Sequence, residues 1–157
     1  MTAKWMVIVL GGLAVLPCPS PAIAQTAGTA VVVSEKNRTR EITLDELRKV
    51  FRGERRSWAV GMPIKLIVRD QGTPERVALL KLLGMSESEY KQYWIAQIFR
   101  GEAEAEPIAL PSLGMQMEAL TVFSGGITFV SAATVKPGMR VLKVDGHLPG
   151  DSGYPLH

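Results

Sequence analysis

The stretch that decides the fold runs from residue 64 to residue 75 and reads IKLIVRDQGTPE. Its first part, Ile64 to Val68, is rich in aliphatic residues and predicts a buried strand. Its second part predicts the start of a helix, because Thr73 is a suitable N-cap and Pro74 costs no hydrogen bond in the first turn. Such a rapid passage from strand to helix is typical of α/β proteins built around one sheet.

The flanking sequence repeats this alternation of strands and helices. On the N-terminal side we expect a strand at 30–33, a loop at 34–41 and a helix at 44–52, opened by a capping box between Thr43 and Glu46. On the C-terminal side the pattern predicts the following elements: helices at 74–83, at 87–100 and from the Ser112 cap to about 123, a loop at 102–111, strands at 127–130 and 139–144, and an irregular tail from 145.

The predicted helices each carry apolar residues at helical spacing, and we interpret these as core contacts rather than as a ligand platform. The expected apolar faces are Val77, Leu80 and Leu83 in the second helix, Tyr90, Trp94 and Ile98 in the third, and Met115, Leu120 and Val122 or Phe123 in the fourth.

The first 24 residues resemble a cleaved export signal. Lys4 provides a positive start, residues 5–16 form an apolar run, and residues 22–24 read Ala-Ile-Ala, as at a signal-peptidase site. The apolar run is short for a membrane span, so an uncleaved N-terminal anchor is the alternative. Cleavage would remove the only cysteine, Cys18. We therefore expect residues 25–157 to form one periplasmic domain with no disulfide and no membrane span.

Composition limits the classes of function. The chain has 157 residues, 46% of them hydrophobic and 21% charged, which suits a single globular domain. A formal charge of +3 gives no reason to expect a nucleic-acid partner. With two histidines and no cysteine after residue 24, no metal site is expected. The sequence also has neither a P-loop nor a dinucleotide fingerprint, so we expect no cofactor.

Three short motifs suggest other functions but have simpler explanations. Residues 150–153, Gly-Asp-Ser-Gly, match the surroundings of a protease nucleophile, yet no histidine base and buried aspartate can be assigned to them, so we interpret them as a turn. Residues 37–39 form a glycosylation sequon that also occurs by chance. Arg55 and Arg56 are interpreted as a solvated turn. No nucleophile and base can be paired, and we do not expect an enzyme.

The joint between residues 69 and 73 has a physical argument for binding an anion. Free amides at a helix start point to one spot, and the positive end of the helix dipole lies behind them. Gly72 allows a ligand to approach the backbone, the Thr73 hydroxyl can donate, and Arg69 adds positive charge. Against this, Glu75 competes for the same dipole. The alternative is that Thr73 is only a structural N-cap.

The order of motifs along the chain resembles the second lobe of the phosphate-binding protein of bacterial phosphate ABC transporters. The matching residues are Ile42-Thr43, Glu46-Leu47, Phe51, Gly53, Trp58, Gly61, Ile64, Arg69, Gly72-Thr73, Glu75, the strand Gly125 to Val130, Asp145-Gly146 and Tyr154-Pro155-Leu156. The segment from Ser86 to Gly101 is similar to small stand-alone members of that group. The resemblance covers roughly residues 30 to 156.

The resemblance implies an α/β fold, namely a single lobe of a type II periplasmic-binding-protein-like fold with a mixed sheet flanked by helices. In the family, the oxyanion is held by an Arg and by a Ser-Gly-Thr segment at a helix start. Gln71 stands here in place of that Ser, and Arg69 lies closer to Gly72 than in the family. Only Gly72 and Thr73 therefore carry over directly.

The function that the resemblance implies is solute binding in the periplasm. We expect weak binding of phosphate or a similar oxyanion by Arg69, Gln71, Gly72 and Thr73, because a single lobe leaves half of the ligand open to water. The expected protein partner is an ABC permease or an envelope sensor protein. The alternative is an envelope interaction or regulatory module that has kept the fold but lost the ligand.

Overall fold

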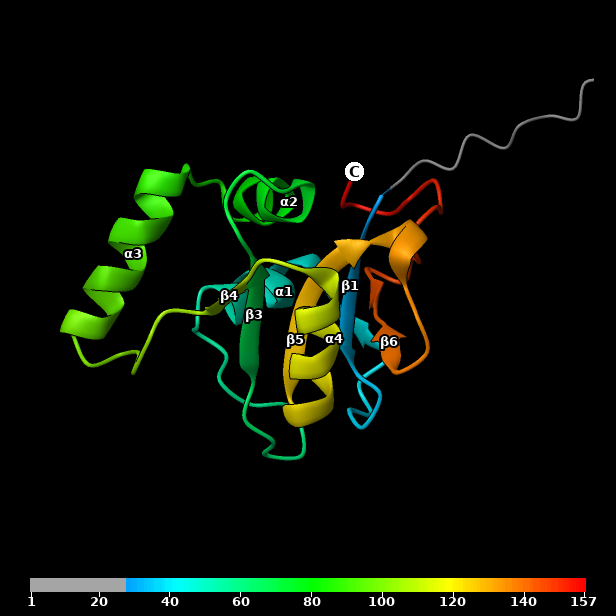
Figure 1. Cartoon of the computed structure of the whole chain (residues 1–157), viewed down its shortest axis with the longest axis horizontal. Helices are drawn as coiled ribbons and strands as arrows, with labels where there is room; N and C mark the ends of the chain where they lie inside the picture. Colours follow the sequence, from blue (N-terminus) through cyan, green and yellow to red (C-terminus); the bar gives the residue numbers. More distant parts are fainter. Residues whose placement is uncertain (1–27) are drawn as a thin grey trace, which may run out of the picture.

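The structure is a computed structural model that describes residues 28–157 (Figure 1). Its centre is a mixed sheet with strand order β4-β3-β5-β1-β6. These strands span Thr29–Ser34 (β1), Lys65–Arg69 (β3), Ile108–Leu110 (β4), Gly126–Ser131 (β5) and Met139–Val141 (β6). A second, two-stranded sheet pairs Glu41–Ile42 (β2) with Lys143–Val144 (β7). The expected export signal, at residues 1–24, lies outside the described residues.

The first strand, β1, lies inside the sheet, between two strands from the C-terminal part of the chain. Strand β1 is antiparallel to β5, with Val31 opposite Phe129, and antiparallel to β6 on its other side. Strand β3 is parallel to both β5 and β4. The sheet is therefore mixed, as the resemblance implied, and contacts between distant parts of the sequence hold it together.

Side-chain caps fix the starts of the helices at the predicted residues. The helices span Leu44–Phe51 (α1), Pro74–Leu83 (α2), Glu87–Phe99 (α3) and Leu113–Val122 (α4), and a 3-10 turn follows β5 at Ala132–Thr134. The capping boxes at Thr43 and Ser86 are both formed, and Thr73 and Ser112 each accept a hydrogen bond from the backbone three residues later. The predicted helix starts are confirmed.

Helices cover both faces of the sheet (Figure 1). On one face, α1, α2 and α3 enclose a core in which the rings of Phe51 and Phe129 stack at 4.8 Å. On the other face, Leu120 of α4 packs with Ile67 and Val130. Because successive side chains of a strand alternate between faces, β3 contributes Val68 to the first core and Ile67 to the second.

The buried faces of the helices differ in part from those expected. Leu83 is buried as predicted and Leu80 is partly buried, but Val77 is 58% exposed, and Leu79 and Leu82 are buried as well. Helix α2 has leucines on several sides, so periodicity alone could not choose between them. Ile98, Met115 and Val122 are also exposed, whereas Leu120 is buried as predicted. In α4, the buried polar residue is Gln116, whose amide donates to the Thr128 hydroxyl and the Phe129 carbonyl.

Short strands account for the other differences. The segment predicted as a loop at 102–111 contains β4, and the loop predicted at 34–41 ends in β2. The strand predicted at 139–144 is divided between β6 and β7, because Leu142 turns inward and the chain moves from one sheet to the other. The tail is irregular as predicted, yet Tyr154 and Leu156 are buried in the core.

Candidate functional site

The predicted strand-to-helix joint is present at the end of β3. Arg69 is the last residue of the strand, and Thr73 is the N-cap of α2. Gly72 has a φ of +83°, which favours glycine, and a Cβ atom there would have nothing within 4 Å. Gln71 and Gly72 are exposed and Thr73 is half-buried. The backbone of this loop is therefore open to an approaching ligand.

The Thr73 hydroxyl is already engaged in the loop itself. It donates to the Asp70 carbonyl at 2.9 Å and accepts from the Arg76 amide at 3.3 Å. Because a hydroxyl has a single proton to donate, this side chain is not free to donate to an anion. The donors that remain at the joint are backbone amides and the side chains of Gln71 and Arg69.

Arg69 carries unsatisfied hydrogen-bonding capacity. Its Nε and Nη1 atoms are buried and have no hydrogen-bond partner within residues 28–157. Strand alternation places Arg69 on the same face of the sheet as Ile67, which is the face that α4 covers. A buried guanidinium nitrogen without an acceptor costs free energy. An oxygen-rich ligand at this edge of the sheet would offset that cost.

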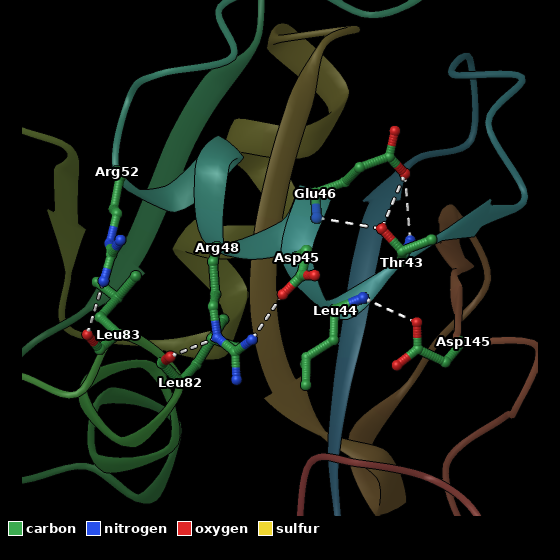
Figure 2. Close-up of polar contacts among 9 residues, drawn as sticks. All are labelled: Thr43, Leu44, Asp45, Glu46, Arg48, Arg52, Leu82, Leu83 and Asp145. Atoms are coloured by element: carbon green, nitrogen blue, oxygen red, sulfur yellow. Dashed lines mark hydrogen bonds and ion pairs between the residues drawn. The ribbon is translucent and has the colours of Figure 1, made fainter.

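At the start of α1, side chains of the protein itself accept the hydrogen bonds of the helix's first backbone amides (Figure 2). The Leu44 amide donates to Asp145 Oδ1 at 3.0 Å, and the Glu46 amide donates to the Thr43 hydroxyl. The Glu46 carboxylate in turn accepts from the Thr43 amide. Carboxylates therefore occupy the positive end of α1, whereas at α2 the acidic side chain in the first turn is Glu75.

Arg48 of α1 and Arg52, the residue that follows this helix, contact the opposite end of α2 (Figure 2). Arg48 Nε donates to the Leu82 carbonyl at 3.2 Å, and Arg52 Nη2 donates to the Leu83 carbonyl at 3.3 Å. Positive side chains are favourable at a helix C-terminus. These contacts fix the direction of α2 and hence the place of its N-terminal end beside β3.

A pocket of about 470 Å³ lies next to the joint, between the β3–β4 edge and α3. Arg69 and Gln71 line it, but Gly72 and Thr73 do not. The structure therefore divides the four predicted residues between a pocket and an exposed loop. The other residues that line the pocket are Val68, Asp70, Arg76, Tyr90, Lys91, Glu106, Pro107 and Ala109.

Arg76 is the residue of this region that the sequence did not indicate. It is only 7% exposed, and it forms a bidentate ion pair with Glu87, in which Nε donates to Oε1 at 2.9 Å and Nη2 donates to Oε2 at 2.8 Å. Its guanidinium carbon lies 4.1 Å from the centre of the Tyr90 ring. Burial acts to lower the pKa of Arg76, but Glu87 and Tyr90 together keep that pKa above its usual value. Arg76 thus joins α2 to α3, and its charge is neutralised within the protein.

The remaining motifs have structural roles. Asn37 of the sequon is buried and accepts from the Thr39 amide, so its side chain does not face solvent. In the 150–153 segment, Asp151 accepts from the Leu148 amide, which forms the predicted turn. Arg55 pairs with Glu46 at 3.1 Å.

Neither a metal centre nor a membrane-spanning helix is found in the part of the chain that the structure describes. Within residues 28–157, no three His, Cys, Asp or Glu side chains are grouped so that they could hold a metal ion. In the same residues, no helix has both the length and the apolar character needed to cross a bilayer.

Comparison with solved structures identifies the fold as about half of a phosphate-binding-protein fold. An ABC-type phosphate transport receptor from Vibrio cholerae matches with a TM-score of 0.62 at 16% identity, over 78% of this chain and 48% of that one. A putative phosphate ABC transporter substrate-binding protein from Clostridium perfringens, solved with bound phosphate, matches with a TM-score of 0.63 at 18% identity, over 78% and 46%. PstS from Borrelia burgdorferi matches with a TM-score of 0.57 at 18% identity, over 78% and 49%.

These matches confirm the expected fold and its likeness to phosphate ABC transporter substrate-binding proteins. The chain spans just under half the length of the structures it matches. No protein-family model and no curated protein matches the sequence. At such low identity the likeness is one of fold.

Proposed function

We propose that this chain is a periplasmic solute-binding-protein-like domain that binds phosphate or a similar oxyanion weakly at the β3–α2 joint. The observation that carries the proposal is the exposed Gly72 backbone at the start of α2, three residues after Arg69, whose buried Nε and Nη1 atoms have no hydrogen-bond partner within residues 28–157. The Clostridium perfringens protein of the same fold holds phosphate, which supports the choice of probe. A transporter permease or an envelope sensor is the proposed partner.

The groups available for the anion differ from those expected from sequence. The Thr73 hydroxyl proton is directed to Asp70, so we assign Thr73 a role through its backbone amide. Gln71 contributes its side-chain amide, and Arg69 contributes charge. A phosphate held on one side only keeps part of its hydration, and we expect a dissociation constant near the millimolar range, which corresponds to about 4 kcal/mol.

The test is a titration of the 15N-labelled protein with inorganic phosphate, followed by backbone amide shifts. We expect Gly72 and Thr73 to shift first, because their amides lie at the start of α2. Gly84, an exposed glycine at the other end of the same helix, is the internal control. Sodium chloride at the same ionic strength should leave Gly72 unchanged. The absence of any shift at tens of millimolar phosphate would refute the ligand assignment and leave the fold intact.

A second candidate function is an envelope interaction or regulatory module without a ligand. Two observations favour it, namely the replacement of the family's Ser by Gln71 and the internal use of the Thr73 hydroxyl. Its test is cross-linking and capture in a bacterial envelope with the native chain and with Arg69→Ala, which removes the charge that the first proposal assigns to the anion. Capture of the same permease or sensor by both chains would support this function, whereas loss of capture in the variant would favour the first proposal.

A further inference from the structure

Helix α3 has one face in the core and one face in solvent. Tyr90 and Trp94 are buried against the body of the protein. On the opposite side, Phe99 is 91% exposed and Ile95 is 52% exposed. Figure 1 shows α3 as the outermost element at one end of the molecule. Leaving a phenylalanine side chain almost fully in water is unfavourable in free energy. Exposed apolar side chains gathered on one helix face are typical of an interaction surface.

The outward face of α3 has the spacing of a helix-pairing seam. Ser88, Gln92, Ile95 and Phe99 are all exposed and follow one another at intervals of four, three and four residues. This is the spacing of the contact positions in a coiled coil. With about 3.6 residues per turn, these four residues lie opposite Tyr90 and Trp94. The seam, defined as these four residues, therefore runs along the whole length of the helix and suits a second helix as its partner.

The charges beside the seam indicate which helix that partner is. Glu89 and Arg100 lie about three turns apart and hence on the same flank of α3. If a second α3 packs antiparallel, each Glu89 faces the Arg100 of the other copy. In a parallel pair the same flank of each helix lies on opposite sides of the pair, so Glu89 would not meet the Arg100 of the other copy. Both side chains are on the surface: Glu89 is exposed, and Arg100 makes only an exposed contact with Glu102 at 3.4 Å.

The side chains of the seam also fit one another in the antiparallel register. Phe99 of one copy lies over Ser88 of the other, whose small side chain leaves room for a ring. Ile95 lies over Gln92 of the other copy in the two central layers. A large residue opposite a small one is the arrangement that fills a helix interface without a void.

We propose that a second copy of this chain docks antiparallel along the outward face of α3 and forms a twofold-symmetric dimer. The same patch is used by both copies, as in an isologous interface. A single helix face of this length buries less than about 1,200 Å², so the dimer is a weak and reversible one. This surface is separate from the β3–α2 joint, and the proposal does not depend on phosphate binding.

The experiment is sedimentation velocity on the protein purified from an exporting host, at concentrations from about 10 µM to about 1 mM. We expect a concentration-dependent shift from monomer to dimer. Phe99→Ser should raise the dimer dissociation constant at least about tenfold. The matched control is Val122→Ser on α4, which removes another strongly exposed apolar residue and should leave the dimer unchanged.

A charge exchange tests the register of the dimer. Glu89→Arg and Arg100→Glu should each weaken the dimer several-fold, and the double variant should recover most of that loss. Glu89 also caps α3 by accepting from the Ser86 amide. Circular dichroism therefore checks that each variant keeps its helix. A monomer at about 1 mM, an equal effect of Val122→Ser, or a double variant as weak as the sum of the single variants would each overturn the proposal.

Discussion

At the scale of single residues, Gly125 is the glycine of residues 28–157 at which an added Cβ atom would make the shortest contact. A Cβ atom there would lie 1.8 Å from the Pro63 carbonyl oxygen. The Gly125 carbonyl also accepts from Trp58 Nε1 at 3.0 Å and from the Lys65 amide at 3.1 Å. We expect Gly125→Ala to lower the free energy of unfolding by roughly 3 kcal/mol or more, because β5 must move away from residue 63. Urea denaturation measures the loss.

Gly114→Ala is the matched control for that prediction. Gly114 lies inside α4, and a Cβ atom there would meet only the Ser112 hydroxyl, at 3.9 Å. Since alanine has the higher helix propensity, this change should raise stability by about 0.5–1 kcal/mol. If both variants lost the same free energy of unfolding, the close contact between residue 125 and Pro63 would not be the cause of the loss in Gly125→Ala.

Residue identity alone predicted some parts of the candidate site but not others. Gly72 and Thr73 could be assigned to a helix start from neighbouring residues alone, because a threonine followed by a proline is typical of an N-cap and the first helical position. The engagement of the Thr73 hydroxyl by Asp70 is also local, but it requires the loop conformation to be known. The burial of Arg76 could not be predicted, since it depends on Glu87 and Tyr90 being brought to it by the turn between α2 and α3.

At the scale of elements, Asp145 connects the end of the chain to the start of α1. It has a φ of +50°, and its carboxylate accepts from the Leu44 amide (Figure 2). We expect Asp145→Ala to cost about 1–2 kcal/mol, because the cap is lost and alanine is strained at positive φ. Hydrogen exchange at Leu44 should become faster in this variant.

Asp145→Asn is the control for the capping role. Asparagine accepts through its amide oxygen and tolerates positive φ, so this variant should lose less than half of what the alanine variant loses. Asp145→Gly removes the cap but relieves the strain, and its stability should lie between the two. If all three variants were equally stable, the contact with Leu44 would have no energetic role.

The elements themselves were predictable where their signals are local. Thr43 with Glu46 and Ser86 with Glu89 fixed two helix starts, because a capping box is formed within four residues. Strands β2 and β4 were missed for the opposite reason. Each has at most three residues, and each exists through a partner that lies far away in the sequence. No periodicity can develop over such a length.

At the scale of the whole molecule, buried tyrosines make stability depend on alkaline pH. Burial raises the pKa of Tyr90 to about 12 and that of Tyr154 to about 12. In the unfolded chain both lose their protons near pH 10. Their contribution is therefore complete below about pH 10 and is lost as the pH rises towards 12. Urea denaturation from pH 9 to pH 12 should show stability falling over this range.

Tyr90→Phe separates this effect from the titration of lysines. The Tyr90 hydroxyl has no hydrogen-bond partner within the described residues, so the variant should be as stable as the native chain at pH 8. At pH 12 the variant should be more stable than the native chain by about 2 kcal/mol. Parallel pH profiles for the two proteins would contradict the raised pKa.

The position of β1 between β5 and β6 has a consequence for the order in which the protein folds. Both of its neighbours, β5 and β6, are synthesised about a hundred residues later. The first strand therefore has no strand to pair with while the middle of the chain is being synthesised. We therefore expect the slow step of folding to be this long-range closure. The pairing of β1 on both sides can therefore form only after residue 141 has left the ribosome.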